Sequence, residues 1–253
     1  MLLLQGKKAL IFGVLNDKSI AWAIAQAFHE QGAELAITYA DKTHEKRVRP
    51  LAESLDAKLI CPCNVTNDEE IKAVLHEVEV LWGALDIIIH AVAFAEKNEL
   101  TGTILNTSRE GFATALDISV YSLLGIIKEA LPVMQGRDAA VLTLSHYGAV
   151  KVFPNYNVMG VAKAALEALV RHLAVAAGSE GIRINAISAG PVRTLASFGI
   201  TGFNQMLGHI EAKAPLCRNI TQADIARSAV YLCSGLASGV TGEIHYVDNG
   251  YNV

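Results

Sequence analysis

The chain has 253 residues, of which 52% are hydrophobic, 18% charged and 6% aromatic. Disordered chains are poor in apolar residues and rich in charge, so this composition excludes disorder. The net charge of −4 argues against a nucleic-acid partner, because such partners require a basic face. Four cysteines in a chain of this length do not suggest a disulfide scaffold, and we interpret them as reduced packing residues of a cytoplasmic protein.

The sequence also argues against a membrane protein and against a metalloprotein. The opening run Met1–Leu4 is too short for a signal peptide, and the longest later apolar run, Leu85–Ala95, is interrupted by Asp86 and His90. We therefore expect no association with a membrane. The histidines and cysteines lack the spacing of metal ligands, so we expect no metal site.

Short apolar runs alternate with longer segments of helical period along the whole chain. Strands are expected at Lys8–Phe12, Glu34–Tyr39, Lys58–Cys61, Leu85–Ala91, Ala139–Leu144, Arg183–Ile187 and Ile244–Val247. Helices are expected at Ser19–Gln31, Thr43–Leu55, Thr66–Trp82, Thr107–Met134, Asn155–Ala177 and Gln222–Cys233. Gly32 stands where a helix-ending glycine belongs, and capping boxes at Thr66–Glu69 and Thr107–Glu110 open two helices. The alternation predicts a single α/β domain over residues 1–253, with a Rossmann-type, doubly wound parallel sheet.

The first predicted loop, from Gly13 to Ser19, suits the phosphates of a dinucleotide. Such a loop needs a glycine for its tight turn and small residues where the helix approaches the pyrophosphate. Gly13 supplies the turn, Ser19, Ala21 and Ala23 are small, and the Ser19 hydroxyl is available to donate to a phosphate. The loop lacks the full pattern of spaced glycines, so an ordinary strand–helix turn fits it as well.

The residues after the second predicted strand indicate which dinucleotide binds. This position usually reads the adenosine ribose, and here it is Tyr39-Ala-Asp-Lys42. No arginine follows the strand directly and the Asp41 carboxylate would repel a 2′-phosphate, which favours NADH. Lys42 and Arg47 lie close enough to reach a phosphate, so NADPH stays as the alternative.

Tyr156 and Lys163 carry the strongest chemical signal in the sequence. Seven residues are almost two turns of a helix, so the two side chains share one face. An ammonium beside a phenol favours the ionised phenolate, and we expect the pKa of Tyr156 to lie below its ordinary value of about 10. Such a phenol can donate a proton or stabilise an oxyanion.

With these residues placed, the chain resembles the short-chain dehydrogenase/reductase superfamily and, within it, the bacterial NADH-dependent enoyl-acyl carrier protein reductases. The resemblance runs essentially from end to end. Carbonyl-reducing members keep a tyrosine four residues before the lysine, where this chain has Met159. The most specific stretches are Ser19–Trp22, Gly32–Leu35, Ala93–Ala95, Thr107–Phe112, Pro154–Gly160, Ala162–Ala164, Asn185–Pro191, Arg193–Leu195 and Ala237–Glu243.

The resemblance implies an NADH site across the carboxyl end of the sheet. The implied cofactor-binding residues are Gly13, Leu15, Ser19, Ile20, Ala40, Asn64, Val65, Ala91, Val92, Lys163, Val192, Arg193, Thr194, Leu195 and Ala196. Within this set, Lys163 binds the nicotinamide ribose and Asn64 lies beside the adenine. The implied substrate-binding residues are Ala95, Tyr156 and Met159, and a helical segment near residues 195–210 resembles the family's substrate cover.

The implied reaction reduces the trans-2 double bond of an enoyl thioester on acyl carrier protein, in the last step of the fatty-acid elongation cycle. Hydride reaches the β-carbon, Tyr156 stabilises the enolate that forms on the thioester oxygen, and the α-carbon is then protonated. The implied catalytic residues are Tyr156, Lys163 and His146. His146 stands where the family commonly has a second tyrosine; it either hydrogen-bonds the thioester or shuttles a proton, or it is a neutral supporting residue. The resemblance also implies a homotetramer.

Two other interpretations of the sequence remain open. A short-chain reductase would act on a 3-ketoacyl thioester or another carbonyl, and a catalytically silent protein would only sense the cofactor. The intact pair of Tyr156 and Lys163 argues against loss of catalysis. Apart from His146, the chain departs from the family pattern at three positions in the cofactor site, which are Ala23, Ala40 and Asn64.

Overall fold

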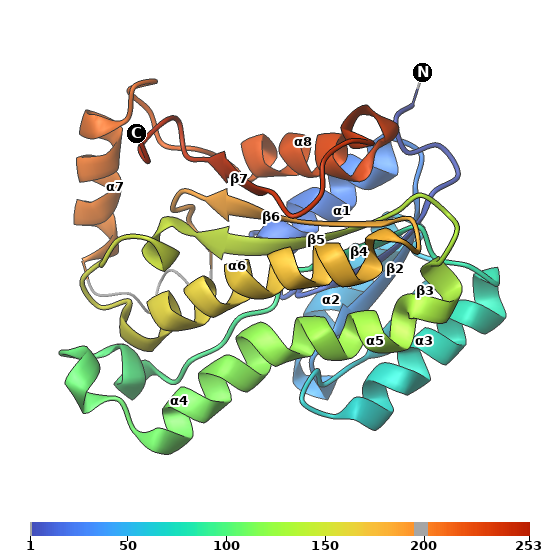
Figure 1. Cartoon of the computed structure of the whole chain (residues 1–253), viewed down its shortest axis with the longest axis horizontal. Coiled ribbons are helices and arrows are strands. Elements are labelled where there is room, and N and C mark those ends of the chain that lie inside the picture. The colour runs from blue at the N-terminus through green and yellow to red at the C-terminus, as the bar shows by residue number, and fades with distance from the viewer. Residues whose placement is uncertain (1, 195–201) are drawn as a thin grey trace.

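The structure is a computed structural model that describes residues 2–194 and 202–253. Its described strands form one sheet in the order β3-β2-β1-β4-β5-β6-β7, in which every neighbouring pair is parallel (Figure 1). The strands are β1 (Lys8–Phe12), β2 (Glu34–Tyr39), β3 (Leu59–Pro62), β4 (Ile87–His90), β5 (Ala139–His146), β6 (Ile182–Ala189) and β7 (Ile244–Val247). The described α-helices are α1 (Ile20–Glu30), α2 (Lys42–Ser54), α3 (Asp68–Trp82), α4 (Arg109–Leu116), α5 (Ser122–Met134), α6 (Asn157–Gly178), α7 (Phe203–Lys213) and α8 (Gln222–Cys233).

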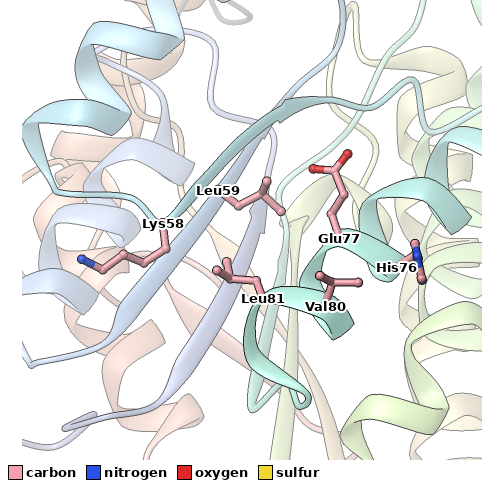
Figure 2. A pocket seen from close by; sticks show the side chains of 6 residues that line it. All are labelled: Lys58, Leu59, His76, Glu77, Val80 and Leu81. Atoms are coloured by element: carbon pink, nitrogen blue, oxygen red, sulfur yellow. The ribbon is translucent and has the colours of Figure 1, made fainter.

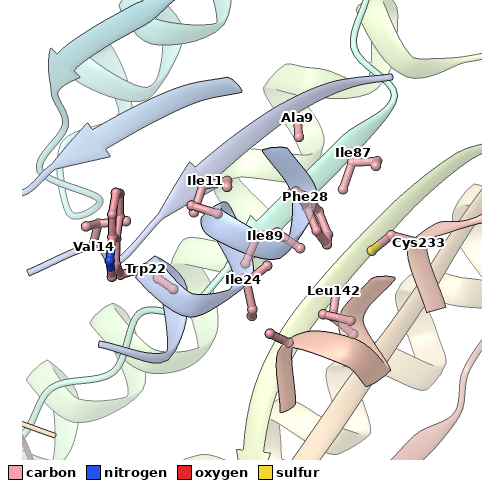
Figure 3. Close-up of a cluster of buried hydrophobic side chains, with 14 of the residues drawn as sticks. Ala9, Ile11, Val14, Trp22, Ile24, Phe28, Ile87, Ile89, Leu142 and Cys233 are labelled. Atoms are coloured by element: carbon pink, nitrogen blue, oxygen red, sulfur yellow. The ribbon is translucent and has the colours of Figure 1, made fainter. Parts of the chain in front are cut away.

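Apolar side chains pack helices onto both faces of the sheet. Ile87 and Ile89 of β4 lie in one core cluster and Ile88 lies in the other, because neighbouring strand residues face opposite sides. The first cluster packs α1 and α8 against the sheet, and Figure 3 shows Phe28 of α1 and Cys233 of α8 within it. The second cluster packs α3, α5 and α6 on the other face. The predicted doubly wound fold is confirmed.

The end of α1 is built as the sequence predicts. Gly32 adopts a left-handed φ of +86°, which a side chain would disfavour. Its amide donates to the His29 carbonyl, and the amide of Ala33 donates to the Phe28 carbonyl. These two bonds satisfy the last carbonyls of the helix and turn the chain directly into β2.

Both predicted capping boxes are wrong by one residue. The N-cap of α3 is Asn67, because the hydroxyl of Thr66 instead donates to the Asn64 side chain. The N-cap of α4 is Ser108, whose hydroxyl accepts from the amide of Gly111. In each case the next polar residue along the chain offers an acceptor of similar quality, so the pattern locates the helix start only approximately.

The long helix predicted to end at Met134 contains a π-helical turn, η3 (Asp117–Tyr121), between α4 and α5. Ser122 follows this turn, donates to the Ile118 carbonyl at 2.6 Å and contacts Nε2 of His90 at 2.8 Å. By length and composition alone, residues 109–134 are apolar enough to cross a membrane. A core helix passes the same test, and one face of α5 is buried in the second cluster.

The predicted substrate-covering segment near residues 195–210 is described only in part. Leu195 and Ala196 lie outside the described residues, whereas α7 begins at Phe203, after Gly202 with a φ of +80°. Figure 1 shows α7 beyond the carboxyl ends of β5 and β6. This edge of the sheet is where ligands bind in doubly wound folds.

Candidate active site

Gly13 shapes the loop between β1 and α1. Its φ is +98°, and a Cβ added at this position would lie 2.2 Å from the carbonyl oxygen of Ala91. The amide of Ala91 in turn donates to the Phe12 carbonyl at 3.2 Å. The first loop therefore lies directly against the end of β4, which only a glycine at position 13 permits.

The start of α1 offers donors to an anion, but not through the hydroxyl that the sequence suggests. Ser19 is the N-cap of α1 and forms no side-chain cap. Its hydroxyl donates to the Asn16 carbonyl at 2.7 Å, so the expected donation to a phosphate is not available in this arrangement. Because no side chain caps the first turn, its backbone amides are the groups that suit a diphosphate.

The residues predicted to bind the adenosine are exposed, and their polar side chains already form hydrogen bonds with neighbouring residues. Asp41 follows the exposed Ala40 and caps α2 through the amide of Thr43. The hydroxyl of Thr43, followed by His44, lowers the pKa of Asp41 to about 2. Asn64, predicted to lie beside the adenine, already accepts twice from Thr66 through its side-chain oxygen, at 3.1 and 2.9 Å.

Three consecutive residues at the end of β5 hold three side chains, one from the N-cap of α6 and two from the first half of that helix. The Lys163 ammonium donates to the Leu144 carbonyl at 2.7 Å. The Ser145 hydroxyl donates to Glu167 at 2.5 Å. The ring centroid of His146, the third of these residues, lies 4.8 Å from that of Tyr156. The end of β5 thus fixes Tyr156 and Lys163 relative to each other.

Lys163 is buried, and this sets its charge. Burial lowers the pKa of Lys163 to about 8, with a smaller opposing effect from the Glu167 carboxylate one turn further along α6. The pKa of Glu167 is itself raised by burial, although the hydrogen bond from Ser145 lowers it. At neutral pH Lys163 is mostly an ammonium, close to the point where it loses its proton.

The expected direction of the pKa shift of Tyr156 is wrong. Burial raises the pKa of this phenol above its ordinary value, because the protein around the hydroxyl solvates a phenolate poorly. The ring packs on Gly148, where an added Cβ would lie 2.5 Å from the ring carbon Cδ1 of Tyr156. Tyr156 is therefore a protonated phenol near neutral pH, and it can act as a hydrogen-bond donor.

His146 is neutral in the folded protein. Burial, and then the charge of Lys163, lower the pKa of His146 to about 4. Its Nδ1 accepts from the amide of Gly148 at 2.9 Å, which places the single proton of the neutral ring on Nε2. His146 thus has one N–H donor to offer, and it does not carry a charge near neutral pH.

Two of the three predicted substrate-binding residues belong to this corner of the molecule. Met159 is buried two residues into α6, and its sulfur lies 4.0 Å from the Ser119 hydroxyl of the π-helical turn. That hydroxyl also accepts from the amide of Phe94, next to the predicted Ala95. The π-helical turn therefore brings the loop after β4 to the first turn of α6, which carries Met159 and follows Tyr156.

The loop after β6 reaches the first loop through a residue that the sequence did not single out. Val192 is buried, Arg193 is exposed and Thr194 is half-buried. The amide nitrogen of the Gln222 side chain donates to the carbonyl of Arg193 at 2.9 Å and to that of Lys18 at 3.2 Å. The predicted cofactor residues of these two loops are thereby brought together.

Three further residues, Glu167, Ser145 and His90, support the site without having been predicted. Glu167 and Ser145 bind each other beside Lys163. His90 is fully buried at the end of β4 and contacts the hydroxyls of Thr143 and Ser122 at 2.8 Å each. The sequence could have indicated Glu167, because it follows Lys163 by four residues, or about one helical turn. The contact of His90 with Ser122 depends on the π-helical turn, which no pattern in the sequence signals.

A shallow pocket elsewhere on the surface takes no part in this site. It lies at the start of β3 and the second half of α3, and Figure 2 shows its apolar floor between charged side chains. Helix α3 returns from the carboxyl end of β3, so this pocket is at the opposite end of the strands from Tyr156. Its lining residues are Lys58, Leu59, His76, Glu77, Val80 and Leu81.

A parallel doubly wound sheet, an uncapped first helix, and a half-buried tyrosine and a buried lysine beyond the strand ends define a Rossmann-type oxidoreductase. Comparison with known proteins makes the assignment specific. Residues 13–252 match the family described as enoyl-(acyl carrier protein) reductase, and the chain belongs to this family. The predicted family, function and enzyme class are confirmed.

Individual relatives agree over almost the full length of the chain. The NADH enoyl-acyl carrier protein reductase FabI of Aquifex aeolicus is 53% identical over 251 residues, which cover 99% of this chain and 93% of the relative. The crystal structure of the Anaplasma phagocytophilum reductase in complex with NAD has a TM-score of 0.94 at 52% identity, covering 98% and 95% of the two chains. A Bacillus cereus reductase solved with NADP⁺ and an indole naphthyridinone has a TM-score of 0.96 at 47% identity, covering 100% and 98%.

Proposed function

We propose that this protein reduces the trans-2 double bond of enoyl thioesters on acyl carrier protein, with NADH as the reductant. The observation that carries this proposal is the arrangement of Tyr156, the N-cap of α6, and Lys163 on that helix, both held by the last residues of β5. The tyrosine lies seven residues before the lysine, which is the family's spacing for an oxyanion that two carbon atoms separate from the carbon that accepts hydride. Full-length relatives named for this reaction support it.

The residues at the carboxyl edge of the sheet suit NADH in two ways: they provide hydrogen-bond donors, and their backbone conformation leaves room for the cofactor. The uncapped first turn of α1 suits the diphosphate, and the loop carrying Gly13 lies tight against Ala91. When bound, NADH supplies the hydride that the double bond accepts. The described residues that we assign to its site are Gly13, Leu15, Ser19, Ile20, Ala40, Asn64, Val65, Ala91, Val92, Lys163, Val192, Arg193 and Thr194.

In this proposal Tyr156 acts as a neutral donor rather than as a base. Its raised pKa keeps the hydroxyl protonated, so it can donate to the thioester oxygen while negative charge builds there. The Lys163 ammonium binds the ribose hydroxyls of the cofactor and adds positive charge near the developing enolate. The Nε2–H of His146 supplies a second donor in the place of the family's second tyrosine.

We assign NADH rather than NADPH as the preferred cofactor. The Asp41 carboxylate stays ionised at any pH in which the enzyme works, and Ala40 offers no donor to a 2′-phosphate. The basic residues nearest to this point are partly engaged, since Arg49 pairs with Glu45 at 2.7 Å. Lys42 and Arg47 are the two cations that would have to move for NADPH to bind well.

The assay that tests the function follows absorbance at 340 nm with two substrates and both cofactors. Oxidation of NADH by a crotonyl thioester supports the proposal. Oxidation only by an acetoacetyl thioester would identify a carbonyl reductase instead, and binding of NADH without turnover would identify a cofactor sensor. A lower KM for NADPH than for NADH would overturn the cofactor assignment.

We further propose a cytoplasmic homotetramer that receives its substrate from acyl carrier protein, without a membrane or nucleic-acid partner. The exposed apolar side chains of Phe112 and Tyr121, on α4 and the π-helical turn, support contact between copies. Cys61 and Cys63 are buried free thiols, as expected in a reducing compartment. Light scattering on the purified protein tests the tetramer, and a mass of about 27 kDa for the particle would exclude it.

A further inference from the structure

Gln222 occupies the first position of α8 and points away from the helix toward two loops. The N-cap of α8 is Thr221, which forms a complete capping box with Asp224, so the start of this helix is fixed without any help from Gln222. The Gln222 side chain therefore takes no part in capping α8 and forms hydrogen bonds elsewhere. Its amide nitrogen carries two hydrogens, and each one has a carbonyl acceptor.

The two acceptors belong to parts of the chain that lie far apart in the sequence. One is the carbonyl of Lys18, at 3.2 Å, directly before the N-cap of α1. The other is the carbonyl of Arg193, at 2.9 Å, in the loop after β6. The Arg193 side chain continues the connection, because it donates to Asn204 of α7 at 2.7 Å. One amide thus joins the first loop to the loop that leads toward α7.

We infer that Gln222 is a positioning residue that sets the affinity for NADH by holding these two loops at the separation that the bound cofactor requires. This inference rests on the proposed function, since both loops contain assigned cofactor residues. Gln222 itself needs no contact with NADH. Without the tie, the loops would have to become ordered when the cofactor binds, and the free-energy cost of that ordering would be subtracted from the binding free energy.

The experiment measures the dissociation constant for NADH by fluorescence titration in Gln222→Met. Methionine keeps the length of the side chain and remains neutral, but it lacks both N–H donors. We expect the Kd for NADH to rise about fivefold, which corresponds to roughly 1 kcal/mol. Gln222→Asn keeps the donors on a shorter stem that cannot reach both carbonyls, so its Kd should lie between those of Gln222→Met and the wild type.

Three comparisons separate positioning from a general loss of stability. Gln26→Met makes the same chemical change at an exposed site on α1 and should leave the Kd unchanged. The melting temperature of Gln222→Met without cofactor should match the wild type, while the increase that NADH produces should become smaller. At saturating NADH, kcat with crotonyl thioester should stay within about twofold.

Other results would overturn the inference. An unchanged Kd in Gln222→Met, or a fall in kcat at saturating NADH without a change in Kd, would remove Gln222 from this role. A wild-type protein that binds NADH but does not reduce crotonyl thioester would contradict the proposed function. The titration of Gln222→Met would still test whether the hydrogen bonds of Gln222 to the two loops set the affinity for NADH.

Discussion

The two regions that meet at the candidate site are built from different parts of the chain. The first loop and the start of α1 act through the backbone, by a glycine packed on Ala91 and by amides that no side chain caps. The end of β5 and the first half of α6 act through buried side chains: Ser145 donates to Glu167, and Lys163 donates to the Leu144 carbonyl. The first region is shaped to bind, whereas the second holds ionisable groups whose protonation the surrounding protein controls.

This difference determines how each region responds to change. A site formed by backbone groups tolerates most side-chain changes around it. It does not tolerate an added atom where two backbone segments are in contact, so we expect it to be most sensitive to steric clashes. A side-chain site tolerates small shifts in space but is sensitive to charge, since burial has already moved the pKa of Lys163 and Tyr156 in opposite directions. Substitutions chosen for each region test whether the two respond in these two ways.

Gly13→Ala should produce the largest effect, and it acts on the backbone region. The new methyl group would lie 2.2 Å from the Ala91 carbonyl and would also require a left-handed φ. We expect unfolding by urea to show a loss of about 2–4 kcal/mol and NADH binding to weaken by about a hundredfold. Gly83→Ala is the matched control, because Gly83 has a similar positive φ of +65° with nothing within 4 Å. Equal effects of the two substitutions would show that conformation matters and the close approach does not.

Tyr156→Phe should produce the next largest effect, and it acts on the side-chain region. The variant keeps the ring that packs on Gly148 and removes only the hydroxyl. We expect kcat with crotonyl thioester to fall by at least about tenfold, or roughly 1.4 kcal/mol of transition-state stabilisation, while the Kd for NADH stays unchanged. A kcat equal to that of the wild type would mean that the phenol is not the donor to the enolate.

Gly148→Ala tests whether the position of the tyrosine matters as well as its chemistry. An added Cβ would lie 2.5 and 2.6 Å from two carbons of the Tyr156 ring, so the ring must move. We expect kcat to fall about five- to tenfold with a smaller change in the Kd for NADH, since a displaced donor stabilises the transition state less well. Gly178→Ala at the end of α6 has open space around it and should leave kcat unchanged. Normal kcat in Gly148→Ala would show that the site tolerates this displacement.

The same contrast explains what could be predicted from the sequence. The strands, most helices and the Tyr156–Lys163 pair follow from patterns of residue type, because apolar period and side-chain chemistry are written directly in the chain. The partner of the Ser19 hydroxyl and the occupied acceptor of Asn64 could not be predicted, since both depend on loop conformation. The pKa of Tyr156 was predicted in the wrong direction, because helical spacing reports a neighbouring charge and says nothing about burial.

The dependence of NADH affinity on pH should be a smaller effect, and it again belongs to the side-chain region. Because burial lowers the pKa of Lys163 to about 8, the ammonium loses its proton as the pH rises through that value. A neutral amine forms weaker hydrogen bonds to ribose hydroxyls, so the Kd for NADH should rise by about fivefold between pH 7 and pH 9. Lys163→Met should bind more weakly at pH 7 and lose this dependence. A flat profile in the wild type would place the pKa of Lys163 outside this range.

Glu167→Gln should produce the smallest effect, and it tests the cause of that pH dependence. The Glu167 carboxylate raises the pKa of Lys163 against the larger influence of burial, so removing its charge should lower that pKa further. The amide oxygen of glutamine can still accept from Ser145, which keeps the link between β5 and α6. If the pKa falls by about half a unit, the protonated fraction at pH 8 drops about twofold, and the Kd for NADH rises in proportion. The midpoint of the pH profile should therefore move to lower pH in Glu167→Gln, whereas an unchanged midpoint would mean that the charge of Glu167 does not act on Lys163.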